Sequence, residues 1–280
     1  AVPEYEAGGG TGDVNIPLDP TDSEIGLLLE NVQDVLVSGV TFKDHRWFSL
    51  ARILDVDRTR GSALNRPWNK RIIVENCRFY TTFNHTYADG TGIPHVKPYK
   101  ADVFIVRNCI FGDEEYRGDK GYEAYYIFNS AVCGCRFKQE WPYGVGFDDC
   151  FHDAVVGNVF DRAPLNLLGL WYGVAVGNTI KEPTVGINVG GFSVVIGNNI
   201  YRANRHGIIV SGNGNIVCGN YIEDASQETN NTYSGIFIGG DDNFVCNNYV
   251  MQTANTANRM KYGIEEGAGH DRNRIVNNYL

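Results

Sequence analysis

The residues best equipped for chemistry lie in one stretch of ten. It holds a phenol at Tyr143, carboxylates at Asp148 and Asp149, and an imidazole at His152. Carboxylates and imidazoles are common general acids and bases. Two carboxylates about 5 to 10 Å apart can act as proton donor and as base or nucleophile in hydrolysis. We therefore consider Asp148 or Asp149 as one member of such a pair, and Glu123 from a neighbouring structural unit as the other.

These side chains also have non-catalytic interpretations. Asp148 and Asp149 could form a solvated turn or pair with a nearby arginine. His152 could be a turn residue that hydrogen-bonds to the backbone. Deciding between the two interpretations requires the elements that position these residues.

A short phrase recurs along the chain, and it defines those elements. It consists of an apolar residue, two or three further residues, an asparagine, one residue and a large apolar anchor, as in Val195–Ile200. Successive anchors are 20 to 37 residues apart, a period typical of stacked repeats. The anchors are Phe42, Phe79, Phe111, Phe137, Phe160, Ile180, Ile200, Ile222, Val250 and Leu280.

A second strand-like piece, opened by glycine, precedes each later phrase. It begins at Gly186, Gly207, Gly235 and Gly263. Units of two or three short strands cannot bury an apolar face alone, so neighbours must stack. The repeat therefore predicts an all-β fold, a single-stranded right-handed parallel β-helix (solenoid) of about ten coils. We assign the β-helix domain to residues 35–280, and residues 1–34 to an N-terminal extension or first partial coil.

One column of the repeat is polar. Two residues before the anchor, the six C-terminal units carry asparagine, which predicts a ladder of stacked amides. Three earlier units carry Cys77, Cys109 and Cys135 there, and Cys218 and Cys246 share another register. Stacked cysteines are either buried thiols or disulfides between coils. Their spacing predicts no metal site.

The glycine-opened strand followed by Val-x-Gly-Asn-x-Ile resembles the repeat of the pectin-lyase-like superfamily, from about Val35 to Leu280. That superfamily includes pectate lyases, polygalacturonases, mannuronan epimerases, phage tailspikes and adhesins. Tyr143, Asp148 and His152 resemble the epimerases' Tyr-Gly-Phe-Asp-Pro-His motif, although this chain has two extra residues and lacks the proline. Arg205-His206-Gly207 resembles their later Arg-His-Gly.

The short middle coils are flanked by longer ones whose extra residues follow the anchor. Loops on one edge at both ends predict a groove over the middle coils. Lys97, Arg162 or Arg205 could neutralise a uronate there, and a calcium ion is an alternative; no other cofactor is implied. The predicted glycan-binding residues are Lys97, Arg162, Asn188, Arg205, His206, Phe237, Tyr262 and Glu265.

Composition limits the partners. A net charge of −9 argues against nucleic acid, and no apolar run reaches the 18 residues of a membrane span. We expect a polysaccharide-active protein that is secreted, on the cell surface or on a virion. We lean to an enzyme, a polysaccharide lyase, epimerase or glycoside hydrolase. The alternative is a non-catalytic structural or adhesive protein that assembles through uncapped coil ends, as a homo-oligomer or filament.

Overall fold

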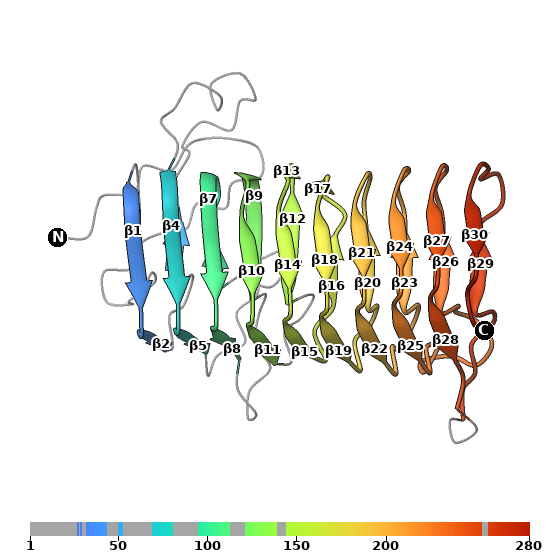
Figure 1. Cartoon of the computed structure of the whole chain (residues 1–280). Coiled ribbons are helices and arrows are strands. Elements are labelled where there is room, and N and C mark those ends of the chain that lie inside the picture. Colours follow the sequence, from blue (N-terminus) through green and yellow to red (C-terminus); the bar gives the residue numbers. More distant parts are fainter. Residues whose placement is uncertain are drawn as a thin grey trace, which may run out of the picture.

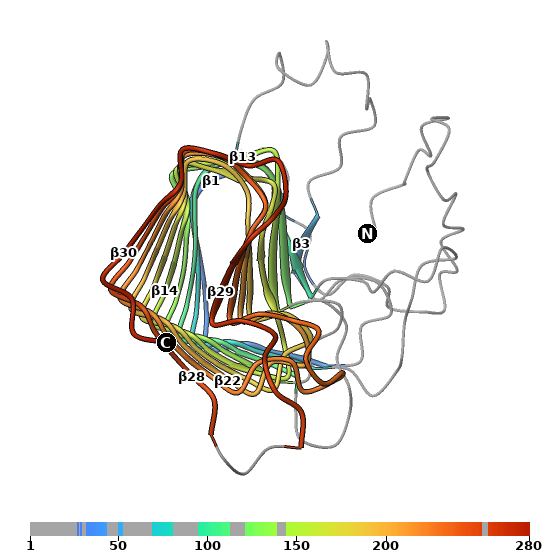
Figure 2. The same ribbon diagram turned by 90° about the vertical axis from the view of Figure 1, so that its right-hand side faces the viewer.

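The computed structural model describes residues 27, 29, 32–43, 50–52, 69–80, 95–112, 121–138, 144–253 and 257–280. Their strands lie side by side in a rod that runs from the N-terminal to the C-terminal end (Figure 1). Seen along the rod, successive coils superimpose on a three-sided outline (Figure 2). Strand pairing is parallel throughout, as in Ile200 with Ile222. The fold is the predicted right-handed parallel β-helix.

The three sides of the outline are three faces, each named for its residues. The valine face contains β1 (Gln33–Ser38), β4 (Asn69–Glu75), β7 (Tyr99–Arg107), β10 (Ala131–Cys133), β14 (Ala154–Val156), β18 (Val174–Val176), β21 (Val194–Ile196), β24 (Ile216–Cys218), β27 (Phe244–Cys246) and β30 (Arg274–Val276). The anchor face contains β2 (Thr41–Lys43), β5 (Arg78–Tyr80), β8 (Ile110–Phe111), β11 (Arg136–Lys138), β15 (Val159–Asp161), β19 (Thr179–Lys181), β22 (Asn199–Tyr201), β25 (Tyr221–Glu223) and β28 (Tyr249–Met251).

The third side is the glycine-strand face. It contains β3 (Leu50–Arg52), β6 (Val96–Lys97), β9 (Tyr122–Phe128), β12 (Val145–Asp148), β16 (Leu165–Leu167), β20 (Ile187–Val189), β23 (Ile208–Val210), β26 (Ile236–Ile238) and β29 (Ile264–Glu266). Two short strands, β13 (Cys150–Phe151) and β17 (Leu170–Trp171), lie on the corner between this face and the valine face.

The anchors form one vertical column inside the rod, as predicted. The first five are phenylalanines, whose rings stack at 4.6 to 5.0 Å between centroids. From Ile180 to Val250 aliphatic residues continue the column in the same register. These nine anchors are buried, whereas the last anchor, Leu280, is 66% exposed. Because a coil has no core of its own, the apolar column holds neighbouring coils together.

The predicted asparagine ladder is present at the turn between the valine and anchor faces. The Asn178 side-chain amide donates to Oδ1 of Asn198 (2.9 Å) and to the Val155 carbonyl (2.9 Å). The backbone N–H of Asn178 donates to the same Oδ1 (3.0 Å). Each amide thus satisfies buried groups of two neighbouring coils, which would otherwise lose hydrogen bonds on folding. Cys135 joins this ladder through its backbone N–H to Asn158.

A second ladder, absent from our sequence analysis, lines the corner between the glycine-strand and valine faces. The backbone N–H of Ser193 donates to Oδ1 of Asn215 (2.8 Å), and that of Asn215 to Oδ1 of Asn243 (2.8 Å). In the middle of the rod a carboxyl takes the amide's place, because Asp153 Oδ1 accepts from the N–H of Ser130 (2.6 Å). Asp153 is 1% exposed, and burial raises its pKa to about 7.

Asp153 should make the protein less stable as the pH rises from about 4 to about 7. The folded carboxyl titrates near 7 and the free one at 3.8, so the folded state binds more protons between these values. Asp153→Asn restores the residue type of the ladder. We expect it to raise the free energy of unfolding at pH 8 by about 2–4 kcal/mol and to flatten the pH profile.

Urea unfolding between pH 4 and pH 8 measures this effect. Asp161→Asn, on the half-buried Asp161 of the anchor face, is the matched control and should leave the profile unchanged. A wild-type stability that rises relative to Asp153→Asn over this range would contradict the prediction.

Candidate functional site

One column of residues occupies the outward register of the glycine-strand face, and we call it the outer stripe. Register places its members directly above one another on successive coils. They are Glu123, Gly146, Asn166, Asn188, Ile209, Phe237 and Glu265. At about 4.8 Å per strand the stripe is roughly 29 Å long. Three predicted binding residues and one predicted catalytic residue therefore share one surface, although they come from separate repeats.

The N-terminal end of the stripe carries two of the predicted catalytic carboxyls. Glu123 pairs in register with Gly146, and Asp148 lies two residues further along β12, on the same outward side. Strand rise and spacing put their Cα atoms about 8 Å apart. Asp148 is exposed, whereas Glu123 is 3% exposed. Adjacent strands of one face therefore carry both carboxyls, as a two-carboxyl mechanism requires.

The C-terminal end of the stripe is built around His206. Its ring centroid lies 5.2 Å from that of Phe237 and 5.1 Å, edge-on, from that of Tyr233. The backbone N–H of Ser234 donates to Nδ1 of His206 (3.0 Å). Burial lowers the pKa of His206 below 6.5. The imidazole is therefore neutral at neutral pH. With Nδ1 accepting from Ser234 its proton is on Nε2, which can donate to a ligand; Nδ1 also lies 3.3 Å from the Ser234 carbonyl, and a proton on Nδ1 would leave Nε2 as an acceptor.

Glu265, at the end of the stripe, is held as a carboxylate. Ser234 Oγ donates to Oε2 (2.5 Å) and Lys261 Nζ to Oε1 (2.6 Å). These two contacts outweigh the effect of burial and lower the pKa of Glu265. Lys261 also lies 5.1 Å from the ring centroid of the exposed Tyr262. Glu265 can accept hydrogen bonds from ligand hydroxyls but is poorly suited to donate a proton.

The predicted arginines border the stripe rather than joining it. Arg205 donates to Glu228 (2.8 Å) and lies 5.9 Å from the Tyr233 ring. Arg162 lies 3.5 Å from Glu182 at the corner with the anchor face. Both guanidiniums are half-exposed, so a ligand carboxylate would compete with the existing ion pairs.

Asn188 occupies the middle of the stripe, where Ser211 Oγ donates to its Oδ1 (3.2 Å). Phe237 lies over glycine backbone, since a Cβ on Gly239 would come within 3.1 Å of its ring. Gly267 on the next coil leaves room for the same ring, at 3.3 Å. Because these glycines have no side chain, the ring of Phe237 can pack along the protein surface instead of projecting away from it.

Asp149 and His152 flank β13, which lies at the corner beyond the stripe (Figure 2). Both have left-handed backbone, with φ of 50° and 58°. The ring of His152 stacks on that of Tyr172 (5.6 Å), which stacks on Phe192 (5.5 Å). Stacked rings turn their faces toward one another, so this ladder offers a sugar mainly ring edges. The geometry favours the interpretation of His152 as a turn residue.

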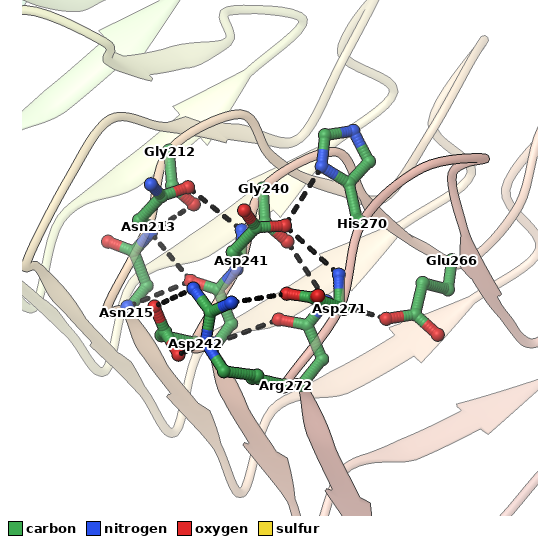
Figure 3. Close-up of polar contacts among 12 residues, drawn as sticks. Gly212, Asn213, Asn215, Gly240, Asp241, Asp242, Glu266, His270, Asp271 and Arg272 are labelled. Atoms are coloured by element: carbon green, nitrogen blue, oxygen red, sulfur yellow. Dashed lines mark hydrogen bonds and ion pairs between the residues drawn. The ribbon is translucent and has the colours of Figure 1, made fainter.

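The same corner becomes polar in the last coils (Figure 3). Arg272 donates to both oxygens of Asp242 (2.6 and 2.8 Å) and to Asp271 (2.7 Å). Asp241 accepts from the N–H of Asp271 (3.0 Å) and lies 3.2 Å from Nδ1 of His270. Within the described ranges, no group of three or more His, Cys, Asp or Glu side chains could hold a metal ion. We regard this network as structural, since its charges pair with one another.

Some residues named in the sequence predictions lie outside the part of the chain that the structure describes. Tyr143 does, as do residues 113–120 and most of the other N-terminal insertions that would wall a groove, whereas the insertions after Ile222 and Val250 are described except for residues 254–256. Lys97 is placed only as part of β6. The sequence analysis did not identify Ser234 or Lys261. Ser234 could have been found from its position directly before Gly235, and Lys261 from its spacing of four residues to Glu265. No helix in the described part of the chain has the length and apolarity to cross a membrane.

Comparison with known proteins supports the fold. No protein-family model matches the chain, and no curated protein does. A mutant of the periplasmic alginate epimerase AlgG is similar in structure, with a TM-score of 0.56 and 12% identity over 90% of this chain and 72% of that one. The A-module of mannuronan C-5 epimerase AlgE6 from Azotobacter vinelandii gives 0.52 and 14%, over 76% of this chain and 61% of that module. Similarity at such identities shows a shared fold, and function needs the site.

The environment of His206 is open to direct measurement. Histidine NMR titration should give a midpoint below 6.5 for His206, assigned with His206→Gln. Glu265→Gln should lower the midpoint further, because the nearby negative charge favours the imidazolium. Glu266→Gln, on the next residue of β29, is the control and should leave it unchanged. A midpoint above 6.5, or a rise in Glu265→Gln, would show that this geometry is wrong.

Proposed function

We propose that the protein binds a polysaccharide along the outer stripe of the glycine-strand face. The observation that carries the proposal is the register of Asn188, Phe237 and Glu265, with Ile209 between the first two. A file of hydrogen-bonding and aromatic groups, one per coil, suits a ligand that itself repeats. His206 adds a neutral donor beside Phe237. The two structurally similar proteins are named for epimerisation of mannuronan and alginate, which supports the same class of ligand.

Within this proposal the chemistry belongs to Glu123 and Asp148. One would protonate the leaving oxygen of a glycosidic bond while the other acts as base or nucleophile. For a lyase or epimerase, His206 is the alternative base if its proton is on Nδ1, donated to the Ser234 carbonyl (3.3 Å), because Nε2 then has a free lone pair. Arg205 or Lys261 would lie near the uronate. We further propose that the protein acts outside the cytoplasm, in keeping with the periplasmic location named for AlgG.

Phe237→Ala should weaken glycan binding at least about tenfold, which corresponds to about 1.4 kcal/mol. Isothermal titration calorimetry against alginate, pectin and neutral glycans provides the measurement. The neutral glycans matter because Arg205 and Lys261 are already paired with carboxylates. Tyr249→Ala removes an exposed ring from the anchor face and should bind like the wild type. If both variants lost glycan affinity equally, glycan binding would not depend on the outer stripe.

Asp148→Asn and Glu123→Gln should each reduce glycan cleavage by about 10² to 10⁴-fold while binding is retained. Release of reducing sugar and of unsaturated ends distinguishes hydrolase from lyase. Asp161→Asn on the anchor face is the control. An unchanged rate would remove the altered residue from the mechanism. Absence of both binding and cleavage, together with multimers in light scattering, would favour a structural or adhesive protein.

A further inference from the structure

Two thiols face each other on the outside of the valine face. Cys218 ends β24 and Cys246 ends β27, and the two residues are in register on adjacent coils. Their Sγ atoms are 2.6 Å apart, with Cys246 donating to Cys218. Paired strands hold Cα atoms near 4.8 Å, within the range that a disulfide spans. No backbone movement is therefore needed to join them.

We propose that Cys218 and Cys246 form a disulfide bond that ties two adjacent coils, with a small disulfide such as oxidised glutathione as the oxidant. The Cys218 thiolate attacks one glutathione sulfur and releases one glutathione. Cys246 then loses its proton and attacks Sγ of Cys218, which releases the second glutathione. Two protein thiols are oxidised and one glutathione disulfide is reduced to two thiols.

The order of these steps follows from burial. Cys218 is half-buried, whereas Cys246 is 4% exposed. Burial, and then the neighbouring Cys218, raise the pKa of Cys246 to about 11. The more accessible thiol reacts with the oxidant first. Cys246 needs to reach only the sulfur beside it.

The other cysteines supply internal controls. Cys109 and Cys135 also lie on adjacent coils, but both are 1% exposed and directed at the backbone. Cys109 Sγ donates to the carbonyls of Arg107 (3.3 Å) and Val74 (3.7 Å). Cys133 shares the outward column of Cys218 and is half-buried, but its register partners are Arg107 and Val156. Because Cys133 is accessible but has no cysteine as a register partner, glutathione bound to it should not be displaced by a second cysteine.

The bond would act on the coils that carry the outer stripe. β24 follows the stripe residue Ile209 in its coil, and β27 follows Phe237 in the next. A bridge on the valine face would limit separation of these coils on the glycine-strand face. It would also restrict the unfolded chain, the usual source of stabilisation by a disulfide. The inference does not depend on which glycan binds.

The test treats the folded protein with oxidised glutathione, blocks remaining thiols with iodoacetamide in denaturant, and maps peptides by mass. We expect Cys218 and Cys246 in one linked pair, Cys133 glutathionylated, and Cys109 and Cys135 alkylated. Cys246→Ser should instead retain glutathione on Cys218. The oxidised wild type should melt several degrees above the reduced protein.

Cys218→Ala, at the more exposed position, provides a second variant should Cys246→Ser fail to fold. In either variant oxidation should no longer raise the melting temperature. Recovery of Cys218 and Cys246 as alkylated thiols after oxidation would overturn the proposal. So would linkage of either cysteine to a different partner.

Discussion

In-register hydrogen bonding between parallel coils is the constraint on which every other feature depends. Each coil meets the N–H and C=O groups of its neighbours, as when the N–H of Ile187 donates to Gly207 (3.0 Å) and that of Tyr221 to Asn198 (2.8 Å). A shift of one residue would turn inward side chains outward. The buried anchors and the asparagine amides oppose such a shift, because both need a matching neighbour. The outer stripe and the cysteine pair are consequences of the same alignment.

Most of the fold could be predicted because the repeat keeps a fixed interior. The apolar residue and the anchor are always five positions apart, and insertions fall outside that phrase. Register follows once the phrases are aligned, and Val195 does pair with Val217. The second ladder has an equally constant position, two residues before each apolar residue. Because this position holds Ser193, Asp153 and several asparagines, no single residue type marks the ladder in the sequence.

The candidate site could be predicted only in part. Alternation along a strand identifies Asn188 and Phe237 as outward residues of coils that are two steps apart, with Ile209 between them. Asp148 and His152 are four residues apart in the sequence, yet left-handed backbone at Asp149 and His152 turns the chain between them. Glu123 is more distant in sequence but shares the face with Asp148. The contacts of His206 with Tyr233 and Ser234 depend on the path of a loop, which the repeat pattern does not encode.

The connections from the anchor face back to the glycine strands differ in length without disturbing either ladder. Ile180 and Gly186 are 6 residues apart, whereas Ile222 and Gly235 are 13 apart, and the strands on both sides keep their pairing. The paired strands are thus unaffected by the length of the segments that connect them. Selection can change a connecting segment, and with it the side chains beside the outer stripe, without disturbing the hydrogen bonding between coils.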